Sequence, residues 1–589
     1  MKDFLKIMLA TLTAMLIAGF VFVIYGISSL VSNLSMAAPA TKVEANSVFV
    51  LDLKGTMIER HEETPLDFLM EDEMKSIGLD DILESIEKAK KNTDIKGIYL
   101  NAELFACSPA SMQTIRKALA DFKESGKFVV AYSGSYTQGT YYIASVADKV
   151  IVNPAGNLSW HGLSSQVIFL KETLEKIGVE MQVFKVGTYK SAVEPFIATK
   201  MSDANREQTQ AYINSIWNQI VTDVAASRNL DNEKLNKLAD QNLDFRPAQD
   251  YVYYGMADTL MYKDQVLDYL KQLTGTKKNK KLATVNLEEM INLTNLSSVS
   301  VGGNQIAVYY AFGEIDNTND KYTQEGINSE KVIMDLRKLR NDKNVKAVVM
   351  RVNSPGGSAY GSEQIWREVQ LLKAEKPVVI SMGDFAASGG YYISCAADWI
   401  VAEPTTLTGS IGIFGMIPDV SKLLTQKLGV KMDGVKTNLM ADMGSINRGL
   451  NSAEKELVQG MVNQGYELFV KRCADGRHMT TDEIKKIAEG RVWTGAMAKE
   501  LKLVDELGGL EAAIKKAAEK AMIYDYQLKS YPEPVDYFTT LLDMTQPERY
   551  ISMKAKQTFG NFYSGFELMN KIEKLDRIQA RMPFMIDIH

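Results

Sequence analysis

Short runs of β-branched and other apolar residues alternate along most of this chain with longer stretches in which apolar residues recur every three or four positions. The short runs have the length and composition of strands, and the longer stretches have the periodicity of helices with one buried face. In the second half we predict strands at Ile306–Ala311, Val345–Arg351, Pro377–Met382, Trp399–Val401 and Lys431–Val435, and helices at Ser329–Arg340, Ser362–Leu372 and Tyr391–Ala397. Such alternation is typical of parallel βαβ units, so the pattern predicts an α/β fold.

The pattern occurs twice along the chain. Residues 141–152 read YYIASVADKVIV and residues 391–402 read YYISCAADWIVA, at an offset of 250 positions and with five identities. The same offset aligns the apolar run 95–100 with 345–350. Internal similarity at a fixed offset indicates a duplicated unit.

The duplication predicts the domain organisation. We expect a first copy at 47–273 and a second copy at 305–525, joined by a Lys-, Asn- and Ser-rich linker at 274–304. After residue 525 the repeating pattern ends, and the tail 526–589 stays unassigned.

The first residues predict a membrane anchor. Ile7–Ile27 is an uncharged apolar run preceded by Lys2 and Lys6. About 20 such residues can span a bilayer as a helix, and the lysines favour a cytoplasmic N-terminus. A cleavable signal peptide is the alternative, although its apolar core is usually shorter. We expect residues 1–46 to form a retained anchor and linker, with the remainder of the chain outside the cytoplasm.

Composition and charge exclude several classes of function. The 589 residues are 46% hydrophobic and 24% charged, as in globular proteins that bury large cores. A net charge of −6 is not typical of a nucleic-acid-binding protein, which is usually basic. The three cysteines and four histidines are scattered, without the spacing of a disulfide framework or metal ligands. We therefore expect neither a metal ion nor another cofactor.

Residues 381–390, Ser-Met-Gly-Asp-Phe-Ala-Ala-Ser-Gly-Gly, are the strongest candidate for a site of chemistry. They place Ser388 at a predicted strand-to-helix turn, among small residues that let a substrate backbone come close. The first N–H groups of the following helix would face a developing negative charge. An ordinary glycine-rich turn is the alternative.

Comparing the two copies favours a site in the second. Gln138 occupies the position of Ser388 in the first copy, where no nucleophile is present. The loop 354–358, Ser-Pro-Gly-Gly-Ser, aligns with 104–108, which lacks glycine, and Ser410 aligns with Trp160. If these small residues only shaped a turn, both copies would need them. Their presence in the second copy alone therefore indicates a functional site there.

A serine nucleophile needs a base, and here the best candidate is a lysine. No histidine lies near these motifs, and we expect His161 to be a packing or surface residue. Lys185 and Lys436 occupy equivalent places, which suggests a shared structural role, whereas Lys190 has Ala441 as its counterpart. A free lysine has a pKa of about 10.4, so burial must lower it by roughly three units before Lys190 can accept a proton at neutral pH. A surface lysine is the alternative.

Three motifs resemble those of the signal peptide peptidase A (protease IV) family, in its long, internally duplicated form. They are Gly-Asp-Phe-Ala-Ala-Ser-Gly-Gly-Tyr-Tyr around Ser388, Tyr-Lys-Ser-Ala-Val-Glu-Pro-Phe around Lys190 and Leu-Thr-Gly-Ser-Ile-Gly-Ile-Phe-Gly around Ser410. The resemblance covers roughly residues 1–525. It implies two tandem βαβ spiral domains similar to crotonases and caseinolytic proteases.

The resemblance also implies roles for individual residues. Ser388 would be the nucleophile, Lys190 the general base, and Ser410 the group that orients the lysine amine. The oxyanion would be held by N–H groups of Gly389 and of the loop containing Gly356 and Gly357.

The expected function is that of a membrane-anchored serine endopeptidase on the external side of a bacterial cytoplasmic membrane. The resemblance implies that it degrades cleaved signal peptides and other extended hydrophobic peptides, and that four chains form a homotetramer shaped like a bowl. A crotonase-like acyl-CoA enzyme and a catalytically silent surface scaffold are the alternatives.

Overall fold

The computed structural model describes residues 43–61, 76–293, 303–316, 326–533, 578–582 and 587–588, together with five isolated positions between 8 and 19. Within this part of the chain no helix has both the length and the apolar character needed to cross a membrane. The predicted anchor Ile7–Ile27 lies outside the described residues, apart from those isolated positions.

The first copy is built on a parallel sheet with strand order β2-β1-β3-β4-β5-β8, and β9 pairs with β1. Its strands are β1 (Ser47–Ile58), β2 (Ser76–Gly78), β3 (Ile95–Ala106), β4 (Phe128–Tyr136), β5 (Lys149–Leu158), β8 (Thr259–Leu260) and β9 (Thr284–Val285). Its helices are α2 (Leu79–Lys91), α3 (Pro109–Lys123), α4 (Gln138–Ala144), α8 (Asn232–Asp240), α9 (Ala248–Tyr253), α10 (Lys263–Leu273) and α11 (Leu287–Ile291).

The second copy repeats this arrangement with strand order β19-β17-β15-β13-β10-β21, and β16 joins β15 to β20. Its strands are β10 (Gln305–Phe312), β13 (Val345–Ser354), β15 (Val378–Ala387), β16 (Trp399–Ala402), β17 (Leu407–Gly409), β19 (Val492–Thr494), β20 (Glu506–Leu507) and β21 (Gln527–Tyr531). Its helices are α12 (Ser329–Asn341), α13 (Ala359–Lys373), α14 (Gly389–Ser394), α15 (Ser452–Arg477), α16 (Thr481–Ile487), α17 (Gly495–Glu500) and α18 (Leu510–Ala521).

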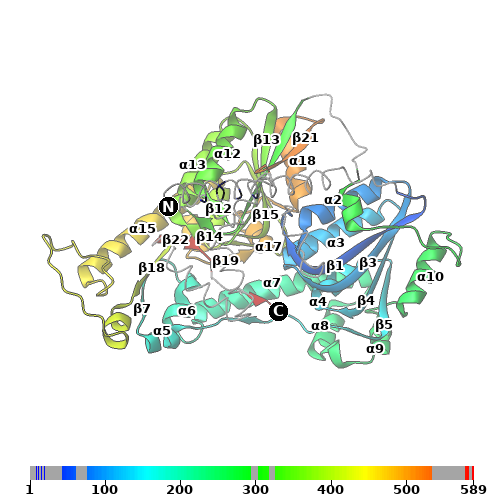
Figure 1. Ribbon diagram of the computed structural model, residues 1–589, viewed down its shortest axis with the longest axis horizontal. Coiled ribbons are helices and arrows are strands. Elements are labelled where there is room, and N and C mark those ends of the chain that lie inside the picture. Colours follow the sequence, from blue (N-terminus) through cyan, green and yellow to red (C-terminus); the bar gives the residue numbers. More distant parts are fainter. Residues whose placement is uncertain are drawn as a thin grey trace.

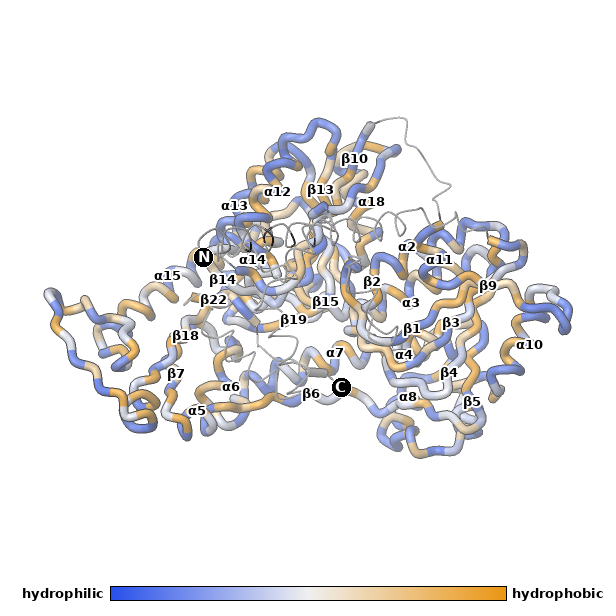
Figure 2. The backbone as a smooth tube through the Cα atoms, in the orientation of Figure 1, coloured by the Kyte–Doolittle hydropathy of each residue, from blue (hydrophilic) through white to orange (hydrophobic). Residues whose placement is uncertain are grey.

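Both faces of the two sheets are buried, which explains why their strands are continuous apolar runs in the sequence. Neighbouring residues of β13 are buried on opposite faces, with Val348 in the larger core of the second copy and Val349 in a smaller core that includes residues of α18. A parallel sheet covered on both faces needs apolar side chains at successive positions. Figure 2 shows hydrophobic residues concentrated along strands such as β1, β3 and β4. The predicted α/β fold and its duplication are confirmed.

One predicted strand is wrong. Lys431–Val435 forms no strand, and its residues are exposed in an irregular segment. Its counterpart in the first copy is the strand β7 (Glu180–Lys185), which pairs antiparallel with β18 (Phe414–Asp419) of the second copy. Among the described residues, only the segment of the first copy has a partner strand.

An arm of the first copy reaches under the second (Figure 1). It comprises β6 (Ser165–Gln166), α5 (Lys171–Ile177), β7, α6 (Glu194–Ile197) and the long helix α7 (Asp203–Arg228). Through β7 the arm enters a third sheet with order β12-β11-β14-β22-β18-β7, to which β11 (Ile315–Asp316), β12 (Ile327–Asn328), β14 (Gly356–Ser358) and β22 (Ile578–Arg581) also belong. The first copy thereby contributes residues directly to the second.

The expected linker and tail both contain ordered elements. β9 and α11 fall within 274–304 and belong to the first copy, because β9 pairs with β1. In the tail, β21 extends the second sheet beside β10, β22 joins the third sheet, and β23 (Asp587–Ile588) pairs with β6.

Candidate functional site

Ser388 lies between β15 and α14, as the sequence predicts, in an unusual backbone conformation. Its φ is 54° and its ψ is −111°, and the residue is fully buried. Its N–H donates to the carbonyl of Gly409 at 2.7 Å, and its own carbonyl accepts from Tyr392 N at 2.8 Å. A non-glycine residue in such a conformation costs of order 1–3 kcal/mol and persists where the surroundings hold it firmly.

Lys190 brings its amine directly to this serine. Lys190 Nζ lies 2.8 Å from Ser388 Oγ, 3.1 Å from Ser410 Oγ and 3.1 Å from the Ser410 carbonyl oxygen. Lys190 is 1% exposed and Ser410 is fully buried. Residues that are 198 and 220 positions from the lysine in sequence thus converge on its amine.

The arm of the first copy holds Lys190 in place by backbone contacts. Just beyond β7, Tyr189 N donates to the carbonyl of Glu489 at 3.0 Å. Gln208 on α7 donates to the Tyr189 carbonyl at 3.0 Å, and its side-chain oxygen accepts from Val492 N at 3.2 Å. The residue before the lysine is therefore bonded to the second copy through its N–H and to α7 through its carbonyl.

Burial gives Lys190 the acid–base character that the chemistry requires. The pKa of its amine is well below its ordinary value because the charged form is desolvated. Among the described residues no carboxylate lies within salt-bridge distance of Lys190 Nζ, so no negative charge stabilises its protonated form. A neutral amine that faces a hydroxyl at 2.8 Å can accept its proton.

The three glycines lie together beside Ser388. A methyl group added to Gly356 (φ 103°) would lie 2.8 Å from Gly389 N, and one added to Gly357 (φ 155°) would lie 2.1 Å from the Ile315 carbonyl. Neither position has room for a side chain. Gly356 N donates to Ser354 Oγ at 3.2 Å, a bond that an oxyanion bound at this N–H would replace.

The strand β22 of the tail lies between β14 and β18, next to these glycines (Figure 1). It pairs antiparallel with β14 on one side and with β18 on the other. The carbonyl oxygen of Ala580 would lie 2.1 Å from a methyl group on Gly356 and 3.0 Å from one on Gly389. The space between β14 and β18 therefore holds an extended strand whose Ala580 carbonyl faces the glycine turn.

Other predicted residues lie elsewhere. His161 is exposed on the first copy, in line with the expected surface or packing position. Lys185 lies in β7 opposite Phe414, whereas Lys436 lies in the exposed segment and pairs with Asp442 at 3.0 Å. The two lysines were expected to share a structural role. The structure places them in different surroundings, because only the first copy forms the strand β7.

Gly490 is a residue of the site that the sequence did not indicate. Its φ is +78°, and a methyl group there would lie 2.7 Å from both Cα and Cβ of Lys190. Gly490 N donates to the Ile411 carbonyl at 2.8 Å. No local motif distinguishes it from the other glycines, because its importance comes from the arm that folds over it.

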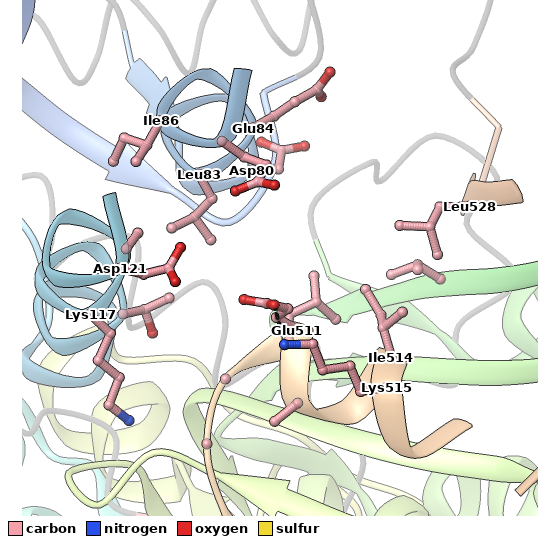
Figure 3. Close-up of a pocket in the computed structure, with 18 of the residues that line it drawn as sticks. Asp80, Leu83, Glu84, Ile86, Lys117, Asp121, Glu511, Ile514, Lys515 and Leu528 are labelled. Atoms are coloured by element: carbon pink, nitrogen blue, oxygen red, sulfur yellow. Dashed lines mark ion pairs between the residues drawn. The ribbon is translucent and has the colours of Figure 1, made fainter. Parts of the chain in front are cut away.

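A cavity of about 1330 Å³ also lies between the copies, but away from the serine (Figure 3). Lys117 and Asp121 of α3 line it on one side, and Glu511, Ile514 and Lys515 of α18 line it on the other. Its lining includes none of the residues that approach Ser388. The candidate site is therefore identified by the chemistry of its side chains and not by this cavity.

Comparisons with known proteins agree with the duplication. A family profile described as Peptidase family S49 matches residues 121–277 and 370–524, one stretch in each copy. A Clp protease profile matches residues 321–402.

Three relatives match over most of the chain. Protease 4 of Salmonella typhi is 36% identical over 528 residues, which cover 87% of this chain and 84% of that protein. Protease 4 of Haemophilus influenzae is 33% identical, covering 90% of this chain and 88% of that protein. The chloroplastic serine protease SPPA of Arabidopsis thaliana is 32% identical, covering 93% and 79%.

Proposed function

The chain belongs to peptidase family S49, and we propose that this serine peptidase works through a catalytic dyad of Ser388 and Lys190. The observation that carries the proposal is the 2.8 Å contact between the buried Lys190 amine and the Ser388 hydroxyl. Ser410 accepts a bond from the same amine and orients it. The first copy contributes the base and the second contributes the nucleophile.

The proposed reaction proceeds through an acyl-enzyme. Lys190 Nζ takes the proton of Ser388 Oγ as the oxygen attacks the peptide carbonyl. The oxyanion forms beside Gly389 and the glycine loop, where backbone N–H groups stabilise it. The lysine ammonium then gives its proton to the departing amine, leaving an ester on Ser388. A water molecule, deprotonated by the same lysine, hydrolyses the ester and regenerates both groups.

We propose extended peptides as substrates, with cleaved signal peptides among them. A strand that enters between β14 and β18 gains backbone hydrogen bonds on both edges, which give affinity, while the surroundings of its alternate side chains give specificity. The position of β22 supports this mode of binding. The signal peptides themselves come from the resemblance of the three motifs to signal peptide peptidase A.

A head-to-tail oligomer is part of the proposal. Within the chain, β7 of the first copy pairs with β18 of the second, and the equivalent segment 431–436 has no such partner among the described residues. Val435, in that segment, is fully exposed. Repeating the same contact between molecules would place this segment on the β6 region of a neighbour, and rings form where such contacts close. A homotetramer held at the external face of the bacterial cytoplasmic membrane by Ile7–Ile27 fits these features.

Labelling with a fluorophosphonate tests the assignment of the nucleophile. We expect the detergent-solubilised protein to be modified at Ser388, as mapped by mass spectrometry, because the reagent reacts with activated serine hydroxyls. Ser388→Ala should abolish labelling, and Lys190→Ala should reduce it strongly. Ser358→Ala serves as a control in the glycine loop. Modification that persists in Ser388→Ala and disappears in Ser358→Ala would place the nucleophile at Ser358.

A further inference from the structure

The strand β22 lies between β14 and β18, where the proposed function places the peptide substrate. Gly357 of β14 pairs with Ala580, and Phe414 of β18 pairs with Gln579. One residue beyond the end of β22, Met582 N donates to the Pro355 carbonyl at 2.9 Å. A strand bonded on both edges next to the nucleophile has the arrangement that the proposed substrate needs, so its side chains lie in the substrate subsites.

Alternate side chains of this strand have different surroundings. Ala580 and Met582 are 0% and 1% exposed and belong to the hydrophobic cores of the second and first copies. Arg581 lies between them and points to the opposite face, since side chains alternate along a strand. Its guanidinium donates two bonds of 2.6 Å to the two carboxylate oxygens of Glu314.

Hydrogen bonds fix the backbone around Glu314, and its side chain bonds Arg581 of β22. Its carbonyl accepts from Ile327 N at 2.8 Å, and the preceding Gly313 donates to the Asn353 carbonyl at 2.9 Å. The following residue, Ile315, pairs with Gly357 in the glycine loop. In the ion pair the side chain of Glu314 is 31% exposed and that of Arg581 is 6% exposed. The carboxylate is therefore partly desolvated, and it belongs to the residue before the one that pairs with the glycine loop.

We propose that Glu314 forms a specificity subsite for a basic side chain of the peptide substrate, at the position that Arg581 fills in β22. The proposal rests on the proposed peptidase function and identifies the peptide that the site prefers: a basic residue between two small or apolar residues. Arginine is favoured over lysine because its planar guanidinium bonds both carboxylate oxygens at once. A neutral residue leaves the Glu314 carboxylate partly buried without its charged partner.

Two internally quenched peptides test the subsite. Both contain the sequence Ile-Gln-Ala-Arg-Met of residues 578–582, and one has glutamine in place of arginine. We expect the full-length protein to cleave the arginine peptide with a kcat/KM about 10- to 100-fold higher, the range for a hydrogen-bonded charge pair. The tail competes equally with both peptides, so it lowers both rates by one factor and leaves their ratio unchanged.

Matched variants assign this preference to one carboxylate. Glu314→Gln should remove the preference, and Glu314→Arg should reverse it in favour of a peptide with glutamate at the same position. Glu233→Gln is the control, because Glu233 is an exposed carboxylate on α8 that bonds Lys237 at 2.6 Å. The control should keep the full preference. A Glu314→Gln protein that still prefers the arginine peptide, or a wild-type protein without preference, would overturn the proposal.

Binding to the inactive Ser388→Ala protein separates this proposal from the proposed reaction. Fluorescence anisotropy of the two peptides should show the same preference for arginine and the same loss of it in Glu314→Gln. Binding with that preference but without cleavage by the active protein would refute peptide hydrolysis and retain the subsite. Cleavage that is indifferent to Glu314 would refute the subsite and retain hydrolysis.

Discussion

The turn around Ser388 and its counterpart around Gln138 share a fold but differ in how the following helix begins and in what the central side chain bonds. In the first copy the helix α4 begins with an ordinary cap: Thr137 has φ −70° and ψ 161°, and its side chain accepts from Thr140 N. In the second copy the residue before α14 is Ser388 itself, with a positive φ and no side-chain cap. The duplicated turn can therefore be relaxed, and the strain in the second copy is not required by the fold.

The side chain of Gln138 bonds backbone groups equivalent to those near Ser388 and the Lys190 amine in the second copy. It donates to the Gly162 carbonyl at 2.9 Å and accepts from the N–H groups of His161 and Gly162 at 3.0 Å. Ser388 Oγ faces the equivalent carbonyl, that of Gly412, at 3.5 Å. In the first copy the side-chain amide of Gln138 bonds these backbone groups itself. In the second copy the smaller Ser388 leaves room for the Lys190 side chain, which comes from the first copy. The comparison teaches that the site depends on both copies.

The largest effect is expected from exchanging the residues at this position. Ser388→Ala should lower kcat by at least about 10³-fold without loss of folding, since removing the nucleophile leaves only binding contributions. Gln138→Ala in the active protein should leave peptide cleavage unchanged. The double variant Ser388→Ala with Gln138→Ser should stay inactive, because among the described residues no lysine amine bonds the side chain at position 138. Restored cleavage in that double variant would show that the copies are interchangeable.

The next largest loss of activity is expected from substitutions of Lys190. Lys190→Ala and Lys190→Arg should both lower kcat/KM by about 10²- to 10⁴-fold, because arginine does not release its proton at working pH. In the unmodified protein kcat/KM should rise with pH as the amine is deprotonated. Burial lowers the pKa of Lys190, so this rise should lie well below the ordinary lysine value of about 10.4.

The control for Lys190 is Lys436, whose side chain is exposed. Lys436→Ala should keep the pH profile and the rate of peptide cleavage. Near-normal activity of Lys190→Ala, together with an inactive Lys436→Ala, would place the base in the same copy as the serine.

Gly490→Ala sharpens the comparison by disturbing the place where the copies meet. A methyl group 2.7 Å from the Lys190 backbone should displace the amine, and a shift of about 1 Å can cost on the order of 10²-fold in rate. Gly126→Ala is the matched control. Gly126 has φ +79° but open space around it, so this substitution should impose similar backbone strain without affecting cleavage. Equal rates in the two variants would contradict the role given to Gly490.

Asp384 should give the smallest effect, on stability. Its counterpart in the first copy is Gly134, while Asp384 accepts two bonds from Ser111 of that copy. Burial first, and then the nearby Glu59, raise its pKa from 3.8 to about 6. Because the folded state holds this proton more tightly than the unfolded state, its stabilising effect is complete below about pH 4 and is lost as pH rises through about 6.

Thermal unfolding at several pH values checks this sign. The melting temperature should fall by a few degrees as pH rises from about 4 to 7, a loss of roughly 2–3 kcal/mol. In Asp384→Asn this fall should be smaller, since the amide carries no titrating proton. An equal fall in both proteins would exclude Asp384 as its source.

The sequence alone determined the parallel βαβ architecture, the duplication and the residue types at the site. Strands such as β13 were predictable because residues buried on both faces of a parallel sheet must be apolar. Comparing aligned positions also singled out Ser388, Lys190 and Ser410 as asymmetric between the copies. These features are local, since each depends on neighbouring residues and on one repeated offset.

Only the tertiary structure decided which groups meet. The distance from Lys190 to Ser388 follows from the pairing of β7 with β18, a contact between segments more than 200 residues apart. The same reason explains the wrong strand at Lys431–Val435, whose apolar pattern lacks a partner strand in the described chain. Gly490 and Glu314 acquire their surroundings from distant segments, the arm and β22, so no pattern around either residue could reveal it. Local periodicity specifies which elements form, whereas long-range packing specifies which side chains lie within bonding distance.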